Sequence, residues 1–313
     1  MVLTVLRALL MNRHGELRTG WRMALFVVLF AFLSGLFLGL LLVLQLIRHS
    51  ALSSGGVVLA ALGASWIMVR FVNRKPLGAI GLFLHPRMGY ELGMGLLLGF
   101  VMMAGIFLVE LLLGYVSVVQ RQLSVAEALG AVGSLGLEFT LAGTLEELLF
   151  RGYLFQTLLQ GIGFLPATLL VSGLFALAHG FNPGITWMAS LNIFLAGVWL
   201  SVAYMKTRSL WLPIALHVGW NFSQSALFSF PTSGIVFADR TLFVLEQGGP
   251  AWVTGGGFGP EGGVVGTVAI LLCSWHILKS RRYGAPEGLI TLDSLEDLLP
   301  AQVGGAGANG GQA

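Results

Sequence analysis

The sequence contains little charge for its length. Asp, Glu, Lys and Arg make up 10% of the 313 residues, whereas 56% are hydrophobic, and the mean hydropathy is +0.86. Because a soluble globular domain carries about 25% charged residues, this composition excludes that class. Cysteine is also scarce: Cys273 is the single one, so no disulfide can form within the chain. The net charge of +3 comes from basic residues in short loops, which predicts no nucleic-acid partner.

The apolar residues gather in blocks of about 20 residues, the length that a helix needs to cross a bilayer. Such blocks are too long and too uniformly apolar for the strands of a membrane barrel. We therefore predict an all-α polytopic membrane protein with about eight transmembrane helices, over Gly20–Ile47, Ser54–Val72, Glu91–Val119, Leu135–Gln160, Phe164–Phe181, Trp187–Met205, Ser209–Phe230 and Val264–Leu278.

The basic residues support this arrangement. With the N-terminus in the cytoplasm, eight spans place 13 of the 17 Lys and Arg residues on the cytoplasmic side, and Arg151 falls within a span. The three on the opposite side are Arg48, Arg121 and Arg240. This asymmetry agrees with the positive-inside rule. We expect a multi-pass protein of a bacterial inner membrane, in contact with membrane lipid, with both termini cytoplasmic.

We divide the chain into four regions. Residues 1–134 form an N-terminal transmembrane region of three helices and an interfacial segment, and residues 135–230 form the core that carries the motifs described below. Residues 231–282 hold an external loop, either a flexible lid or a simple connection, and the last helix. Residues 283–313 have the composition of a disordered cytoplasmic tail. Two GxxxG patterns, beginning at Gly35 and Gly95, are typical of close helix packing.

The segment TLEELLFRGYL, Thr144–Leu154, places two glutamates and an arginine inside an apolar span. Ionisable residues inside a membrane are costly and usually functional. Glu147 and Arg151 are four residues apart and share a helix face, which predicts an ion pair. Glu146 lies about 100° further round the helix and must face another surface. A purely structural charge cluster explains the pair but not Glu146.

Two other spans carry polar groups at helical spacing. His179 follows Phe175 by four residues, and Asn221 follows His217 by four, so each pair shares a helix face. A histidine near a helix end is usually structural, and an asparagine can simply bond across helices. Together with Glu146, however, these groups lie away from the membrane surfaces and must satisfy one another or hold water. We therefore predict a polar, water-filled cavity between the helices.

Three motifs in this region resemble the signatures of the CPBP family. These are the CAAX-protease and bacteriocin-processing intramembrane proteins, once called the Abi family, which include the Ras-converting CAAX prenyl endopeptidases. The resemblance covers roughly residues 135–230, and its motifs are Glu146-Glu147-x-x-x-Arg151, Phe175-x-x-x-His179 and His217-x-x-x-Asn221. It implies a helical intramembrane glutamic endopeptidase with a water-filled active-site cavity and no cofactor.

Carried over residue by residue, the resemblance implies a role for each position. Glu146 would be the general base, and His179 would help to position the attacking water. His217 and Asn221 would stabilise the oxyanion. The residues that would support the site are Glu147, Arg151 and Phe175. The substrate would be a membrane-associated peptide or protein, which could carry a lipid anchor.

Two other functions remain open. In a zinc-dependent membrane protease, Glu146, His179 and His217 would be metal ligands with an open position for water, although the HExxH pattern is absent. A non-catalytic scaffold, immunity factor or transporter would use the cavity for binding. The sequence assigns no role to Glu110 or Glu138 and does not identify the substrate.

Overall fold

The computed structural model describes residues 9–12 and 15–286, and within them it confirms the predicted helical membrane fold. The predicted disordered tail lies almost entirely outside these residues. The main helices are α2 (Thr19–Val43), α3 (Ser50–Ile67), α4 (Met88–Leu112), α5 (Val125–Glu147), α6 (Leu154–Ile162), α7 (Phe164–Ala178), α8 (Trp187–Thr207), α9 (Trp211–Phe222) and α11 (Val264–Lys279).

Five helical segments of the described chain are long and apolar enough to cross a membrane. They are Thr19–Val43, Ser50–Val72, Met88–Leu112, Val125–Ile162 and Trp187–Thr207. The second of them continues α3 through a π-helical turn at Met68–Val72. α7 and α11 are apolar but shorter. Every predicted span overlaps a helix, but the count of eight membrane crossings stays a prediction.

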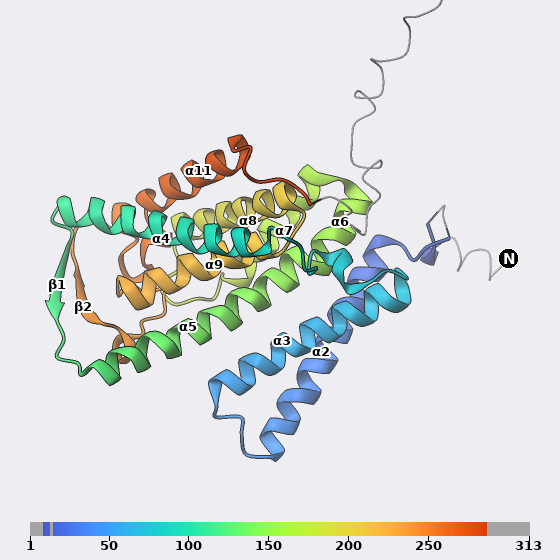
Figure 1. The fold of residues 1–313 in the computed structure, drawn as a ribbon, viewed down its shortest axis with the longest axis horizontal. Helices are drawn as coiled ribbons and strands as arrows, with labels where there is room; N and C mark the ends of the chain where they lie inside the picture. Colours follow the sequence, from blue (N-terminus) through green and yellow to red (C-terminus); the bar gives the residue numbers. More distant parts are fainter. Residues whose placement is uncertain (1–8, 13–14, 287–313) are drawn as a thin grey trace, which may run out of the picture.

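The predicted span Glu91–Val119 is wrong at its end, and the fold is not entirely helical. α4 stops at Leu112 because Gly114, with φ +70°, adopts a left-handed conformation that ends a helix. The chain then forms β1 (Val116–Gln120), which pairs antiparallel with β2 (Phe243–Gln247). This two-stranded sheet stands at one end of the bundle, between α4 and α5 (Figure 1).

The predicted span Leu135–Gln160 begins ten residues too late. α5 starts at Val125, where Ser124 and Glu127 form a capping box: the Ser124 side chain accepts from the Glu127 amide, and the Glu127 carboxylate accepts from the Ser124 amide. α5 therefore runs through the predicted boundary between residues 134 and 135. At its other end a π-helical turn, Leu148–Tyr153, separates it from α6.

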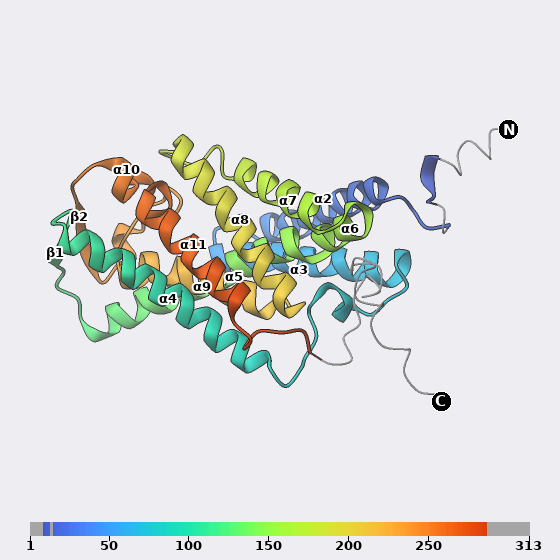
Figure 2. The same ribbon diagram turned by 90° about the horizontal axis from the view of Figure 1, so that it is seen from above.

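Helices α5, α7, α8, α9 and α11 supply residues to the lining of the cavity, and α4 lies alongside α9 and α11 in the same bundle (Figures 1 and 2). α4 packs most closely on α9, because Gly95 and Gly99 let the two backbones meet. A Cβ added at Gly99 would lie 2.4 Å from the amide nitrogen of Trp220. This GxxxG prediction is confirmed. The other is not: nothing lies within 4 Å of a Cβ added at Gly35 or Gly39.

The helices α2 and α3 form an antiparallel pair on the side of α5 away from α8 and α9 (Figure 1). The outer side of α2 is apolar and open, with Val28, Phe32 and Leu36 each more than 60% exposed. Such a surface suits contact with lipid chains rather than with water. It agrees with the membrane character of the chain.

The connection between α9 and α11 is ordered and packed against the bundle. It contains β2, the short helix α10 (Ala251–Thr254) and the 3-10 turns η5 (Ala238–Arg240), η6 (Gly256–Phe258) and η7 (Pro260–Gly262). Its Glu261 is only 6% exposed. This connection therefore forms one wall of the cavity and is not the simple connection that the sequence analysis considered.

Candidate active site

The charged motif lies at the junction between the α-helix α5 and a π-helical turn. α5 ends at Glu147, and Arg151 belongs to the π-helical turn that follows. Within this turn Gly152 has φ −73° and ψ −121°, a conformation outside the helical region that suits a residue without a Cβ. Turns of this type are frequent at functional sites in helices. The sequence predicted an uninterrupted helix here, so the turn corrects that expectation.

Glu147 and Arg151 form the predicted ion pair. Glu147 Oε1 lies 2.9 Å from Arg151 Nη1, and both side chains are completely buried. Arg151 also donates from Nη2 to the carbonyl oxygen of Gly197 in α8, at 3.0 Å. Its guanidinium lies over the ring of Phe175 in α7, with Cζ 4.7 Å from the ring centroid. The pair therefore joins α5, α7 and α8 at the centre of the bundle.

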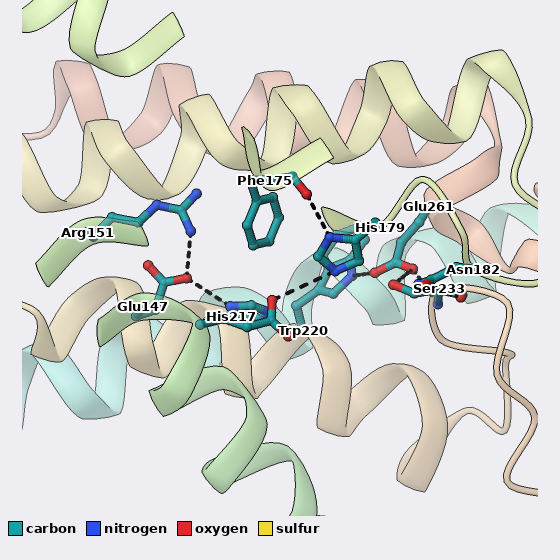
Figure 3. Close-up of polar contacts among 10 residues, drawn as sticks. Glu147, Arg151, Phe175, His179, Asn182, His217, Trp220, Ser233 and Glu261 are labelled. Atoms are coloured by element: carbon teal, nitrogen blue, oxygen red, sulfur yellow. Dashed lines mark hydrogen bonds and ion pairs between the residues drawn. The ribbon is translucent and has the colours of Figure 1, made fainter. Parts of the chain in front are cut away.

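His217 of α9 binds the same carboxylate oxygen. Its Nδ1 lies 2.9 Å from Glu147 Oε1, so Glu147 bridges Arg151 and His217 (Figure 3). Because an ionised carboxylate only accepts hydrogen bonds, Nδ1 of His217 carries a proton. The other ring nitrogen, Nε2, faces Glu146, 3.7 Å from its Oε2. The sequence analysis placed Glu147 with Arg151 but did not connect it to His217.

His179 approaches Glu146 from the end of α7. Its Nδ1 lies 2.8 Å from the carbonyl oxygen of Phe175 (Figure 3). A carbonyl oxygen only accepts, so Nδ1 is the donor. Nε2 of His179 is therefore directed at Glu146, 3.8 Å from Oε2.

Glu146 thus faces both imidazole rings at their Nε2 atoms. Separations of 3.7 and 3.8 Å are too long for direct hydrogen bonds, and Oε2 has no hydrogen-bond partner within the described chain. They are distances across which a water molecule commonly bridges two polar groups. The Glu146 side chain is 27% exposed, whereas that of Glu147 is completely buried. The two adjacent glutamates therefore differ in their surroundings, as predicted.

A cavity of about 410 Å³ brings these groups together. All four residues predicted to be catalytic line it: Glu146, His179, His217 and Asn221. Asn221 lies one helical turn beyond His217 on α9 and is 9% exposed. Phe175 also lines the cavity, whereas Glu147 and Arg151 lie behind its wall. Of the three predicted supporting residues, only Phe175 can therefore contact a molecule in the cavity, and the roles of all these residues stay predictions.

The sequence analysis missed Glu261, which lines the cavity from turn η7. Its Oε1 accepts from Nε1 of Trp220 at 3.2 Å, and its Oε2 accepts from the amide and the hydroxyl of Ser233 at 2.6 and 2.8 Å (Figure 3). These partners are 41 and 28 residues away along the chain. No local spacing could have identified the site of this acid.

The two acids that were left without a role have different positions. Glu138 lies two helical turns before Glu146 on α5 and lines the cavity, where it pairs with Arg240 at 2.5 Å. Glu110 in α4 is completely buried and is not among the residues that line the cavity. Only Glu138 is therefore placed to act on a molecule in the cavity.

Glu146, His179 and His217 are also the residues that the zinc-dependent alternative would use as metal ligands. In residues 9–12 and 15–286, no three His, Cys, Asp or Glu side chains gather as a metal-binding group. Nevertheless, Nε2 of His179 and Nε2 of His217 both face Oε2 of Glu146, and imidazole and carboxylate are the ligands that zinc prefers. These residues would hold the ion if one is bound, and it would supply an activated water.

Comparison with known proteins matches the part of the chain that carries these residues. Residues 128–223 match the family described as type II CAAX prenyl endopeptidase Rce1-like. The uncharacterized protein YyaK of Bacillus subtilis (strain 168) is 24% identical over 204 residues, which cover 63% of this chain and 67% of YyaK. No solved structure matches the chain.

The helical bundle and its glutamate and histidine cavity are features of a helical membrane protein, and they agree with the CAAX-protease family model that matches residues 128–223. The matched segment contains every predicted site residue, from Glu146 to Asn221. The similarity of residues 128–223 to the Rce1-like family therefore supports the predicted resemblance of this core to the CAAX proteases. This family indicates a membrane protease that acts on peptides or proteins.

Proposed function

We propose that this protein is an intramembrane endopeptidase in which Glu146 activates a water molecule to cleave a peptide bond. The observation that supports this most directly is the position of Glu146 Oε2, which faces Nε2 of both His179 and His217 in one cavity. A water molecule held there contacts a carboxylate that can accept its proton. A positioned general base typically raises a rate by about 10²–10⁴-fold.

The first step joins the water to the substrate. Glu146 takes one proton from the water while the water oxygen attacks the carbonyl carbon of the peptide bond. His179 orients the water, because its Nδ1 proton is engaged by Phe175 and its Nε2 accepts the second hydrogen. Glu146 then returns its proton to the amide nitrogen as the carbon–nitrogen bond breaks. The products are a carboxylic acid and an amine.

His217 and Asn221, both on α9, stabilise the oxyanion. Asn221 donates from its side-chain amide. His217 donates from Nε2 when both ring nitrogens carry protons, with Nδ1 bound to Glu147. Glu147 is then the counter-ion of this imidazolium, and Arg151 holds Glu147 in place. An oxyanion donor of this kind is typically worth about 2.7–4 kcal/mol in the transition state.

We further propose that the cavity opens towards the outer face of the membrane. With both termini in the cytoplasm, the connections after α7 and after α9 lie outside, and these supply Asn182, Ser233 and Phe237 to the cavity lining. The substrate is then a membrane-associated or lipid-anchored peptide presented on the outer leaflet. In a Cys273→Ser protein in intact cells, an impermeant maleimide should label Val236→Cys but not Leu84→Cys. The reverse pattern would place the cavity on the cytoplasmic side.

The test of the activity uses the full chain reconstituted in lipid. Glu146→Gln keeps the size of the side chain but removes its basicity, so it should trap substrates without cleaving them. Peptides captured by this variant, identified by mass spectrometry, should be cleaved by the wild-type protein. The matched control is Glu246→Gln, which removes an exposed carboxylate on β2 outside the cavity. It should leave cleavage unchanged.

The other two functions give different results in the same test. Loss of cleavage on chelation, with recovery on adding zinc, would establish the zinc-dependent mechanism, whereas the glutamate mechanism predicts insensitivity to chelators. A scaffold or transporter predicts that Glu146→Gln leaves the cellular phenotype of the folded protein intact. Either result would overturn the proposed role of Glu146.

A further inference from the structure

The cavity contains an ionic contact that the proposed chemistry does not use. Glu138 Oε2 lies 2.5 Å from Nη1 of Arg240, and the two side chains are 32% and 39% exposed. The guanidinium of Arg240 also lies over the ring of Phe237, with Cζ 5.2 Å from the centroid. Both Glu138 and Phe237 line the cavity, whereas Arg240 does not. An arginine of the chain itself therefore reaches the edge of the cavity from turn η5.

A carboxylate beside an aromatic ring is a binding site for a cationic side chain. The carboxylate accepts charge-assisted hydrogen bonds, and the ring attracts the cation through its electron-rich face. Phe237 is held in position because its ring packs edge-on against Phe139 of α5, with centroids 5.4 Å apart. The guanidinium of Arg240 already contacts both Glu138 and Phe237, so these two residues together accept a cationic side chain.

The charge of the cavity points to the same class of ligand. Its lining in the described chain contains three carboxylates, Glu138, Glu146 and Glu261, and neither Lys nor Arg. Glu261 accepts hydrogen bonds from Trp220 and Ser233, and Glu146 faces the two histidines. Glu138 is therefore the lining acid that pairs with a half-buried arginine outside the cavity lining.

Arg240 can leave Glu138 without unfolding its turn. Arg121 donates to the carbonyl oxygens of Thr241 and Asp239, at 3.1 and 3.4 Å, and so holds the backbone on both sides of Arg240. Solvent reaches this half-buried ion pair and weakens it, so exchanging one cation for another has a small cost. An incoming lysine or arginine can therefore replace Arg240 at this carboxylate.

The position of Glu138 relates this subsite to the reacting bond. Glu138 and Glu146 are eight residues apart on α5, which corresponds to a rise of roughly 12 Å. An extended peptide covers about 3.3 Å per residue. A peptide lying along α5 with its scissile bond at Glu146 places a side chain three or four residues away beside Glu138.

We propose that Glu138 and Phe237 form a subsite for a lysine or arginine side chain of the substrate, three or four residues from the bond that is cut. Arg240 occupies this subsite in the free protein and is displaced when a cationic peptide binds. The inference rests on the proposed function for the identity of the ligand as a peptide. Binding to the subsite does not itself require turnover.

The test measures binding in the Glu146→Gln protein, reconstituted in nanodiscs of neutral phosphatidylcholine. The probes are fluorescein-labelled decapeptides of alanine, leucine and glutamine in which one arginine is moved along the sequence, each compared with the peptide that has glutamine at that position. Anisotropy should show binding about threefold to tenfold tighter for arginine at the preferred position. Adding Glu138→Gln should remove this preference, and adding Glu138→Arg should transfer it to glutamate at the same position.

Two further variants test whether Arg240 competes for the subsite and whether the effect is specific to Glu138. Arg240→Ala should tighten binding of the arginine peptide and leave the glutamine peptide unchanged, because the competing cation is gone. Glu246→Gln, the matched loss of a carboxylate outside the cavity, should keep the full preference. The proposal is overturned if no position prefers arginine, or if the preference survives Glu138→Gln. Because cleavage is not measured, failure of the proposed peptidase activity would appear separately, as equal turnover by wild-type and Glu146→Gln proteins.

Discussion

The buried contact between Glu147 and Arg151 makes a quantitative prediction about stability. Removing one partner of a buried ion pair leaves an uncompensated charge and typically costs about 3–5 kcal/mol. Glu147→Ala leaves Arg151 with the carbonyl of Gly197 and the ring of Phe175, and it also removes the partner of His217. We therefore expect Glu147→Ala to lie in the upper part of this range.

The double variant Glu147→Leu with Arg151→Met should cost less than the sum of the single changes. It removes both charges and fills their space with apolar groups of similar size, a replacement that is often neutral in buried pairs. We expect a coupling free energy of at least about 2 kcal/mol between the two positions in a double-mutant cycle.

The chain provides its own unfolding probe. Cys273 is the single cysteine of the sequence and is buried, so a thiol-reactive dye reports the opening of the bundle without any engineered label. Thermal unfolding in detergent should show Glu147→Ala lower in Tm by on the order of 10 °C. Additive effects in the cycle, or a Glu147→Ala protein as stable as the wild type, would show that this pair does not hold the bundle.

The same measurement checks three smaller predictions. Gly99→Ala forces a Cβ against the backbone of α9 and should cost about 1–3 kcal/mol, whereas Gly35→Ala meets open space and should not destabilise the protein; equal melting of the two would contradict the close packing of α4 on α9. Glu261→Gln replaces one acceptor oxygen by an amide N–H, so either the indole N–H of Trp220 or the backbone amide of Ser233 loses its acceptor; this should cost about 1–3 kcal/mol, and an unchanged Tm would mean that η7 does not depend on this acid. Burial and the nearby Arg87 lower the pKa of His85 from its usual 6.5. Since the unfolded chain then binds this proton more readily, stability should decrease as the pH falls below about 6.5, and His85→Gln should reduce that decrease; an identical pH dependence in the variant would assign it to other groups.

The sequence was sufficient to predict which residues meet at the site. Glu146, His179 and His217 come from three helices, and a common polar cavity was expected because polar groups inside a membrane must satisfy one another or hold water. The bridge from Glu147 to His217 was not predictable, because helical spacing relates only residues on the same helix. The π-helical turn at Leu148–Tyr153 was also missed, since the four-residue spacing of Glu147 and Arg151 fits a regular helix equally well.

The parts of the fold that the sequence did not predict were missed for similar reasons. Tyr115 and the strand Val116–Gln120 continue an apolar run, so hydropathy alone extends the preceding span through them. Gly114, followed by β-branched residues, was the local signal for a strand. The cavity wall made by Glu261 depends on partners far away in the sequence, and such contacts leave no periodic pattern. The features that the sequence did not predict therefore depend on contacts between residues far apart in the chain.

The central claim is that Glu146 acts as the base while Glu147 supports the site. The most direct measurement compares cleavage of one captured peptide by wild-type, Glu146→Gln and Glu147→Gln proteins, with the folded fraction of each determined from the Cys273 thiol. We predict that Glu146→Gln lowers cleavage by about 10²–10⁴-fold with an unchanged Tm, whereas Glu147→Gln lowers both cleavage and Tm. Cleavage by a folded Glu146→Gln protein at the wild-type rate, or identical behaviour of the two variants in both assays, would contradict this account.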